Sequence, residues 1–358
     1  MSTTHKERLG MAKEELWTGD RGTEQAALFG RWSDKDELFH PEANIPGDTL
    51  TETWAYLWYI PEERIYSQIH IWVHPNLNVV TAGIGVARGH KNSMLSAELL
   101  DVPAYASAAN LGDGSDMTFA NGLRVQIIEP FKKMRITYDD PARGNALDLT
   151  ITDFSPPVMR GSENHFDQAT YNEGRVTLRG KTYKIASHGI RDRSWGQLRT
   201  EALVAGPPFT WMTGIFADQK LSWNLAAFDD PDRDPDWTGV FEVDRNETVH
   251  DGWLCIGEEL SRLTNASKIT RRDPVTLRPL SHEIRFTDKW GRDYHISGKT
   301  TATLPWTGWP NMFAWLCLTE WSMDGKVVGW GDTQEVQWGD YTHALRGDQD
   351  LGRPGNWR

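Results

Sequence analysis

Apolar and polar residues alternate with a period of two over most of the chain after about Thr51. Successive side chains of a strand point to opposite faces, so this alternation predicts half-buried β-strands. In 53–60, for example, Trp54, Tyr56 and Trp58 share one face. The predicted strands of the first half are 53–60, 67–74, 78–86, 123–128, 133–138, 146–154, 175–178 and 182–186.

Short turn signals such as Asn121-Gly122, Arg143-Gly144-Asn145 and Arg179-Gly180 separate these strands. Such closely spaced strands are typical of antiparallel hairpins in a barrel or sandwich, because parallel strands need long crossovers. Helical periodicity is confined to the N-terminus and to residues 93–100. The pattern therefore predicts an all-β protein with a short N-terminal helix or arm.

The strand pattern restarts after Arg199, and Gly206-Pro207-Pro208 marks a boundary. Three further hairpins are predicted, with strands 209–216 and 221–228, 280–287 and 294–301, and 313–322 and 327–336. A chain of 358 residues is too long for one ordinary core. We expect an N-terminal arm over 1–45, a first β unit over 46–204, and a second β unit with a C-terminal tail over 205–358.

The composition excludes some classes of binding partner and favours others. The net charge of −12 argues against nucleic acid, which needs lysine and arginine to neutralise phosphates. No apolar run is long enough to span a membrane, and the N-terminus lacks the apolar core of a secretion signal. Cys255 and Cys317 lie in apolar surroundings and are expected to be buried thiols in a reducing compartment, the cytoplasm. The 18 tryptophans suit the walls of an apolar pocket.

Familiar cofactor motifs are missing from the sequence. There is no Gly-x-Gly-x-x-Gly, no phosphate-binding loop and no Gly-x-Ser-x-Gly elbow, so no cofactor is expected. His70 and His74 would share a strand face but lie about 13 Å apart, too far to chelate one ion, so no metal site is assigned. The acidic run 229–236 contains two prolines and favours a solvated turn over a calcium loop.

The densest polar cluster runs from Ser187 to Gly196, after the predicted strand 182–186. One interpretation is structural: a salt-bridged corner in which arginines hold Asp192 and Trp195 enters the core. The other is functional: an acid/base group preorganised beside an apolar cavity, where burial shifts its pKa. The residues themselves leave both interpretations open.

The run Arg191-Asp192-Arg193-Ser194-Trp195-Gly196 resembles the signature of the bacterial hydroxyneurosporene synthase (carotenoid 1,2-hydratase)-like, or AttH-like, family. The segment beginning at His165, and Glu52-x-Trp54 further upstream, resemble earlier parts of that family's pattern. The resemblance implies two tandem antiparallel lipocalin-like β-barrels. It also implies chemistry without a redox cofactor, as in hydratases of isoprenoids and plant phenolics and in fungal cyclases. Asp192 matches the family's aspartate and His165 its preceding histidine.

Two functions follow as hypotheses. The first is a cofactor-independent acid/base lyase or isomerase acting on an apolar aromatic or isoprenoid molecule. The second is a lipocalin-like carrier or sensor that holds such a ligand without turnover. The expected catalytic residues are Asp192, His165, His188 and Arg191, and the expected substrate-binding residues are Trp54, Tyr56, Trp58, Trp72 and Trp195. The oligomeric state is open, with a homodimer among the alternatives.

Overall fold

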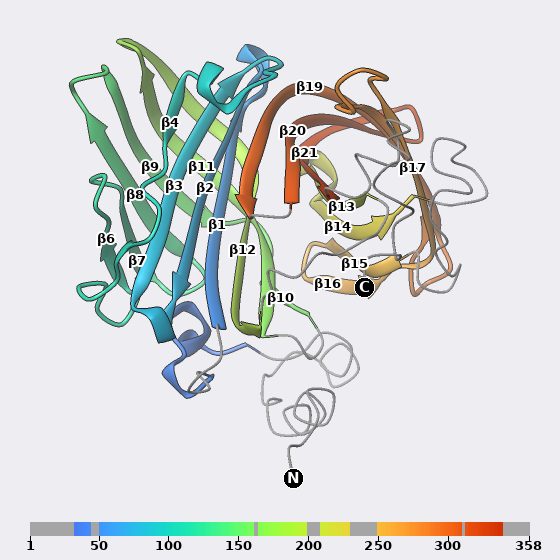
Figure 1. The fold of residues 1–358 in the computed structure, drawn as a ribbon. Coiled ribbons are helices and arrows are strands. Elements are labelled where there is room, and N and C mark those ends of the chain that lie inside the picture. The colour runs from blue at the N-terminus through green and yellow to red at the C-terminus, as the bar shows by residue number, and fades with distance from the viewer. Residues whose placement is uncertain are drawn as a thin grey trace, which may run out of the picture. The chain divides into compact units, whose positions relative to one another are not determined.

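The computed structural model describes residues 32–43, 50–160, 164–198, 208–229, 249–309 and 312–338. Two antiparallel sheets, each strongly curled, make up these residues (Figure 1). No α-helix occurs in these ranges, only short 3-10 helices. The prediction of an all-β fold is therefore confirmed. The helix or arm predicted at the N-terminus lies largely outside the described residues and stays a prediction, and residues 32–43 hold two 3-10 helices.

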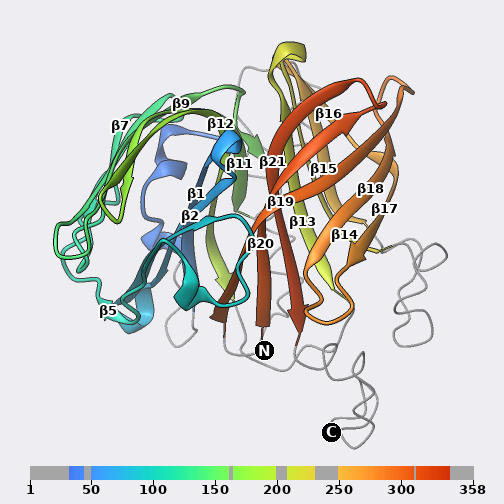
Figure 2. The ribbon, with the colours of Figure 1, turned by 90° about the horizontal axis from the view of Figure 1, so that it is seen from above.

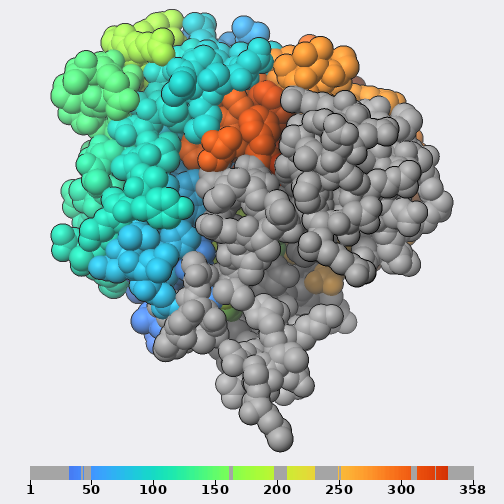
Figure 3. Space-filling view, viewed as in Figure 1, coloured from blue at the N-terminus to red at the C-terminus, as the bar shows by residue number. Residues whose placement is uncertain are grey.

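The first sheet has twelve strands, ten of them in the order β4-β3-β2-β1-β12-β11-β9-β8-β7-β6. Its side chains form the teal and green surface in Figure 3. Its strands are β1 (Leu50–Ile60), β2 (Ile65–His74), β3 (Val79–Arg88), β4 (Leu99–Asp101), β5 (Ala106–Ser107), β6 (Asp116–Thr118), β7 (Arg124–Glu129), β8 (Lys133–Asp140), β9 (Asn145–Asp153), β10 (Val158–Met159), β11 (His165–Leu178) and β12 (Lys181–Leu198). Short 3-10 helices accompany them: η1 (Asp34–Glu37), η2 (Pro41–Ala43), η3 (Pro61–Glu63), η4 (Pro75–Leu77) and η5 (Met94–Ser96).

The second sheet has nine strands in the order β16-β15-β14-β13-β21-β20-β19-β18-β17 (Figure 2). Its elements are β13 (Phe209–Phe216), η6 (Ala217–Gln219), β14 (Leu221–Phe228), β15 (Val249–Ile256), β16 (Glu259–Arg262), β17 (Thr264–Arg272), β18 (Pro279–Thr287), β19 (Asp293–Trp309), β20 (Met312–Met323) and β21 (Val327–Trp338). All three predicted hairpins of this half are confirmed. Cys255 and Cys317 are buried thiols, as expected.

Contacts divide the chain into two compact units. The first comprises residues 1–60, 67–86 and 98–200, and the second comprises 61–66, 87–97 and 201–358. Two of the three residues proposed as a boundary, Gly206 and Pro207, lie outside the described residues, so that boundary stays a prediction. None of the described helices is long and apolar enough to cross a membrane.

Each sheet has a buried apolar core. On β9, burial alternates residue by residue, with Leu147, Leu149 and Ile151 buried between partly exposed neighbours. In the second unit, Trp223, Phe286 and Trp321 belong to one large buried cluster. On β9 the period of two therefore reports correctly which side chains are buried, and apolar side chains form the core clusters of both units.

Candidate functional site

The candidate site lies where β11 pairs with β12. These strands form a long antiparallel ladder in which Asp167 lies directly opposite Asp192, and His165 opposite Ser194. Directly opposed residues project from the same face of a sheet, and so do residues two apart on one strand. The ladder therefore places His165, Asp167 and Asp192 side by side on one face of the first sheet. We call these three residues the His165 trio.

The imidazole of His165 sits between the two carboxylates. Its Nε2 atom is 2.5 Å from Oδ2 of Asp192 and 3.3 Å from Oδ1 of Asp167. The other oxygen of Asp167 accepts a hydrogen bond from Nε of Arg160 at 3.0 Å. The Asp167 side chain is fully buried, whereas those of His165 and Asp192 remain 13% and 17% exposed. Asp192 is thus the carboxylate of the trio that a small molecule can reach.

The charges around His165 decide its protonation. Burial lowers the pKa of the imidazole, but the nearby Asp192 carboxylate and the hydrogen bonds to both carboxylates outweigh this effect. The guanidinium of Arg160 opposes them, and the net result raises the pKa of His165 to about 9. At neutral pH the site therefore holds an imidazolium ion pressed against a carboxylate, which is a proton donor beside a proton acceptor.

The same three side chains have the spacing of a metal site, because one ligand atom from each lies within 4.8 Å of the others. Metal binding would need the neutral imidazole, which costs more when two carboxylates hold the proton in place. Arg160 already compensates Asp167. The charges of the trio therefore favour proton chemistry over a divalent cation.

Arg191 lies on the opposite face of the sheet. It is buried, and its guanidinium donates two hydrogen bonds to the Glu37 carboxylate, at 2.7 and 2.6 Å, and one to Oε1 of Gln168 at 2.7 Å. Glu37 also accepts the backbone N–H of Phe131 at 2.7 Å. Arg191 is thereby bound by structural partners on all three guanidinium nitrogens and holds η1 against the first sheet. Its place is that of a structural anchor, although it was predicted to assist catalysis.

Arg193 makes a second anchor on that face. Its guanidinium donates to Oε2 of Glu52 at 2.5 Å and to the backbone oxygen of Leu38 at 2.6 Å, and it stacks 3.8 Å above the Trp54 ring. Burial alone would raise the pKa of Glu52, but hydrogen bonding from His40 and the charge of Arg193 hold that pKa below its usual range. The salt-bridged interpretation of 187–196 thus applies to the arginines, while Asp192 pairs with His165.

His188 stands apart from the trio. It projects from the same face as Asp192 but four residues away, about 13 Å along the strand. Its ring packs edge-on against Phe154, with ring centroids 4.6 Å apart, and lies 5.3 Å from the Tyr171 ring. Burial lowers the pKa of His188, so the imidazole is neutral at neutral pH. The structure does not bring His188 together with the pair formed by His165 and Asp192.

The predicted aromatic pocket residues are all buried. Trp54 is the direct partner of Arg193, so Trp54, Tyr56 and Trp58 share the face that carries the arginines. Trp195 stacks on His40 at 4.1 Å with nearly parallel rings. Trp72, on β2, packs against the ring of His70. The rings of Trp54, Tyr56 and Trp58 therefore lie on the opposite face of the sheet from the His165 trio.

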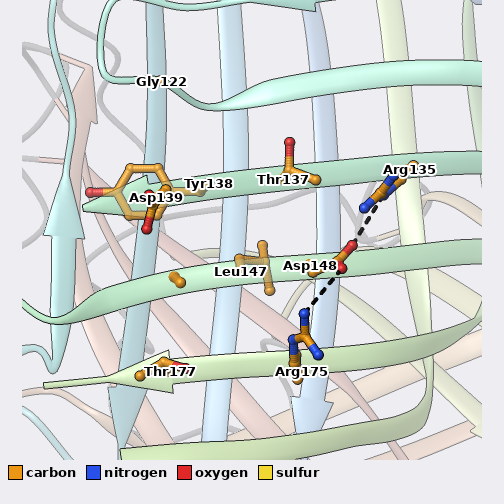
Figure 4. Close-up of a pocket in the computed structure, with 10 residues that line it drawn as sticks. Gly122, Arg135, Thr137, Tyr138, Asp139, Leu147, Asp148, Arg175 and Thr177 are labelled. Atoms are coloured by element: carbon orange, nitrogen blue, oxygen red, sulfur yellow. Dashed lines mark hydrogen bonds and ion pairs between the residues drawn. The ribbon is translucent and has the colours of Figure 1, made fainter. Parts of the chain in front are cut away.

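A shallow pocket of about 280 Å³ opens elsewhere on the first sheet (Figure 4). Arg135 and Arg175 flank Asp148 in it, with nitrogen–oxygen distances of 3.1 and 3.8 Å. Arg175 lies ten residues along β11 from His165, about 33 Å away at the usual strand rise. This pocket is therefore separate from the trio, and its Arg135, Asp148 and Arg175 side chains pair with one another.

The sequence analysis did not predict some of the residues that surround the site. Nothing local marks Glu37 as the partner of Arg191, because 154 residues separate them. Arg160 gave no signal either. Asp229 was expected in a solvated turn, but it is fully buried and ion-paired with Lys268 at 2.6 Å, so the expectation was wrong for that residue. The other residues of 230–236 lie outside the described part of the chain.

Comparisons with known proteins identify relatives of the fold. A family model described as a domain of unknown function (DUF7064) matches residues 33–340. No curated protein matches the chain. The structure is similar to kievitone hydratase from Nectria haematococca, with a TM-score of 0.55, 13% identity, and coverage of 91% of this chain and 98% of that one. It is also similar to CghA, with a TM-score of 0.53, 10% identity, and coverage of 82% and 93%. At these identities the likeness shows a shared fold.

Proposed function

The chain belongs to the family defined by the domain of unknown function DUF7064, and from that premise we propose that it is an acid/base enzyme that needs no redox cofactor. Its substrate is an apolar aromatic or isoprenoid small molecule. The reaction is addition or loss of water, with release of a small carbonyl fragment and isomerisation as related alternatives that use the same proton transfers.

One observation carries this proposal: the 2.5 Å contact between His165 and Asp192, backed by Asp167 and Arg160. Such a pair supplies both halves of a hydration. The Asp192 carboxylate takes a proton from water as the water oxygen bonds to carbon. The His165 imidazolium gives a proton to the adjacent carbon, and the pair then re-equilibrates. Dehydration runs through the same steps in reverse, so no net proton is consumed by the protein.

Asp167 and Arg160 position the His165–Asp192 pair without taking part in the proton transfers. Asp167 is fully buried and bonded on both oxygens, so it orients His165 and shares the stabilisation of the imidazolium. The ladder position of Asp192 fixes the second partner without any loop. A site built on two paired strands keeps its groups in register, which is what proton transfer over short distances requires.

Support for the substrate class comes from two similarities. The run from Arg191 to Gly196 resembles the signature of carotenoid hydratases. One structural relative is a hydratase by name and shares the fold along 91% of this chain. Both similarities favour addition or removal of water on a largely apolar skeleton over redox or group-transfer chemistry.

The alternative function is a carrier of an apolar ligand. It is favoured by the position of Trp54, Tyr56 and Trp58, whose side chains lie on the face opposite Asp192. A ligand held among these rings would contact no member of the trio. In that case the ligand would bind without turnover, and changing Asp192 would not matter.

A substrate panel separates the two functions. Phenolic and isoprenoid alkenes, and the corresponding alcohols, are incubated with the protein, and products differing by the mass of one water are sought by mass spectrometry. The Asp192→Asn variant should lose at least about 100-fold in rate, the usual scale for a positioned acid or base. Asp116→Asn is the matched control, because Asp116 is exposed and paired with Arg124 in the same unit. Unchanged turnover in Asp192→Asn, with folding intact, would refute the proposal.

A further inference from the structure

A chain of hydrogen bonds runs through the second unit and ends at His282. Nζ of Lys268 donates to Oδ1 of Asp229 at 2.6 Å and to Oγ1 of Thr270 at 3.1 Å. Oγ1 of Thr270 lies 3.1 Å from Nδ1 of His282. All four side chains are buried, on β17, β18 and the end of β14. The His165–Asp192 chemistry proposed above makes no use of them.

The bond from Lys268 favours one tautomer of His282. Because Thr270 accepts from the lysine ammonium, its own hydroxyl proton is free to donate to Nδ1 of His282, and this arrangement favours the tautomer with its proton on Nε2. Burial, together with the charges of Lys268 and Arg272, lowers the pKa of His282 to about 3. The imidazole is therefore neutral, and in the favoured tautomer its single proton resides on Nε2, which is then an N–H donor.

That donor is buried and has no hydrogen-bond partner among the described residues. His282 is 1% exposed, and its ring packs against the indole of Trp321, with centroids 5.7 Å apart. Trp321 belongs to the apolar cluster of the second unit, in edge contact with Trp223 at 5.0 Å. Buried donors in proteins nearly always have an acceptor, and none of the described residues supplies one for this N–H, so it is open to an acceptor on a bound molecule.

Two features restrict the acceptor. First, the four charges linked to the Lys268–Thr270–His282 chain compensate one another: Arg272 binds Glu335 at 2.9 Å and also binds Asp229, which binds Lys268. A guest bound at His282 would therefore find these neighbouring charges already paired and should itself be neutral. Second, a buried water usually makes about three hydrogen bonds. Beside an indole, an oxygen carried on an apolar skeleton suits the Nε2 proton of His282 better.

We propose that the interior of the second unit binds a neutral, aromatic ketone or phenol through a hydrogen bond from Nε2 of His282 to its oxygen. Trp321 and Trp223 supply the apolar contact, and the Asp229–Lys268–Thr270 chain holds the imidazole in the donor tautomer. This binding site is distinct from the His165 trio. It does not depend on that trio's chemistry.

The test uses prodan, an uncharged aromatic ketone dye, with the full-length protein. Binding is followed by dye emission and by quenching of tryptophan fluorescence. His282→Phe should weaken binding at least about tenfold, the effect of losing one hydrogen bond to a buried acceptor. His295→Phe is the control, because His295 lies on the neighbouring strand β19, is 49% exposed and pairs with Glu283. It should bind the dye like the wild type.

Long-range ¹H–¹⁵N spectra of the histidines give a readout that does not depend on folding of the phenylalanine variant. The wild type should show His282 as the Nε2–H tautomer, with the Nε2 signal moving when prodan is added. Thr270→Val should remove that preference and weaken dye binding. The proposal is overturned if the wild type does not bind prodan, if His282→Phe binds it equally well, or if a crystal structure shows only water at Nε2. Turnover by the His165 trio would be unaffected by any of these results.

Discussion

Replacing Asp192 by asparagine should make the stability of the protein lose most of its dependence on pH above neutrality. In the folded protein the pKa of His165 is raised from 6.5 to about 9. At about 1.4 kcal/mol per pH unit, that rise corresponds to roughly 3 kcal/mol of stabilisation of the imidazolium. Because the folded pKa lies above the unfolded one, this stabilisation is fully present below pH 6.5. It is lost as the pH rises through about 9.

Asp192 is the closer of the two carboxylates, so the variant should lose about 1–2 kcal/mol of unfolding free energy at pH 6 and little at pH 10. Urea unfolding followed by tryptophan fluorescence at the two pH values measures the difference. An NMR titration of His165 checks the cause, since its pKa should fall in the variant. Asp116→Asn serves as the control. An equal loss at both pH values, or an unchanged pKa of His165, would refute the reasoning.

Three other predictions follow from the contacts. Glu37→Gln leaves the Arg191 guanidinium buried without its counterion, so unfolding free energy in urea should fall by about 3 kcal/mol, and a fall below about 1 kcal/mol would contradict the anchor. Gly174→Ala should destabilise by more than about 2 kcal/mol, because its φ is +157° and a Cβ would lie 2.1 Å from the Asp148 carbonyl oxygen; a wild-type melting temperature would disprove this. Mn²⁺ should bind the His165 trio no more tightly than about 1 mM by calorimetry, and micromolar binding would point to a metal site instead.

Local signals predicted the hairpins well. The turn at Asp218-Gln219-Lys220 separates β13 and β14, whose bounds match the expected strands, because turn chemistry and alternation both act over a few residues. The turn at Arg179-Gly180 also sets the register of β11 against β12. It pairs Leu178 with Lys181, and continuing that register back along both strands brings Asp167 opposite Asp192. The candidate site could therefore have been assembled from the sequence by counting from this turn.

Long-range contacts could not be predicted in this way. The predicted strand ended at residue 186, and one of the two interpretations made 187–196 a salt-bridged corner, but the run lies inside β12. Strands β1 and β11 flank it and supply its ladder bonds, so tertiary pairing overrides its polar composition. Its odd and even positions then face opposite sides, which separates Arg191 from Asp192. The partner of Arg191, Glu37, comes from a distant segment that no periodicity connects to it.

The proton transfer assigned to Asp192 and His165 is tested most directly by the pH dependence of kcat/KM on a substrate found in the panel. This parameter reports the ionisation of groups in the free enzyme. We expect it to fall above pH 9, as the imidazolium of His165 loses its proton, and to drop at least about 100-fold in Asp192→Asn. A profile that stays flat from pH 6 to pH 10, or an Asp192→Asn variant as fast as the wild type, would contradict this assignment.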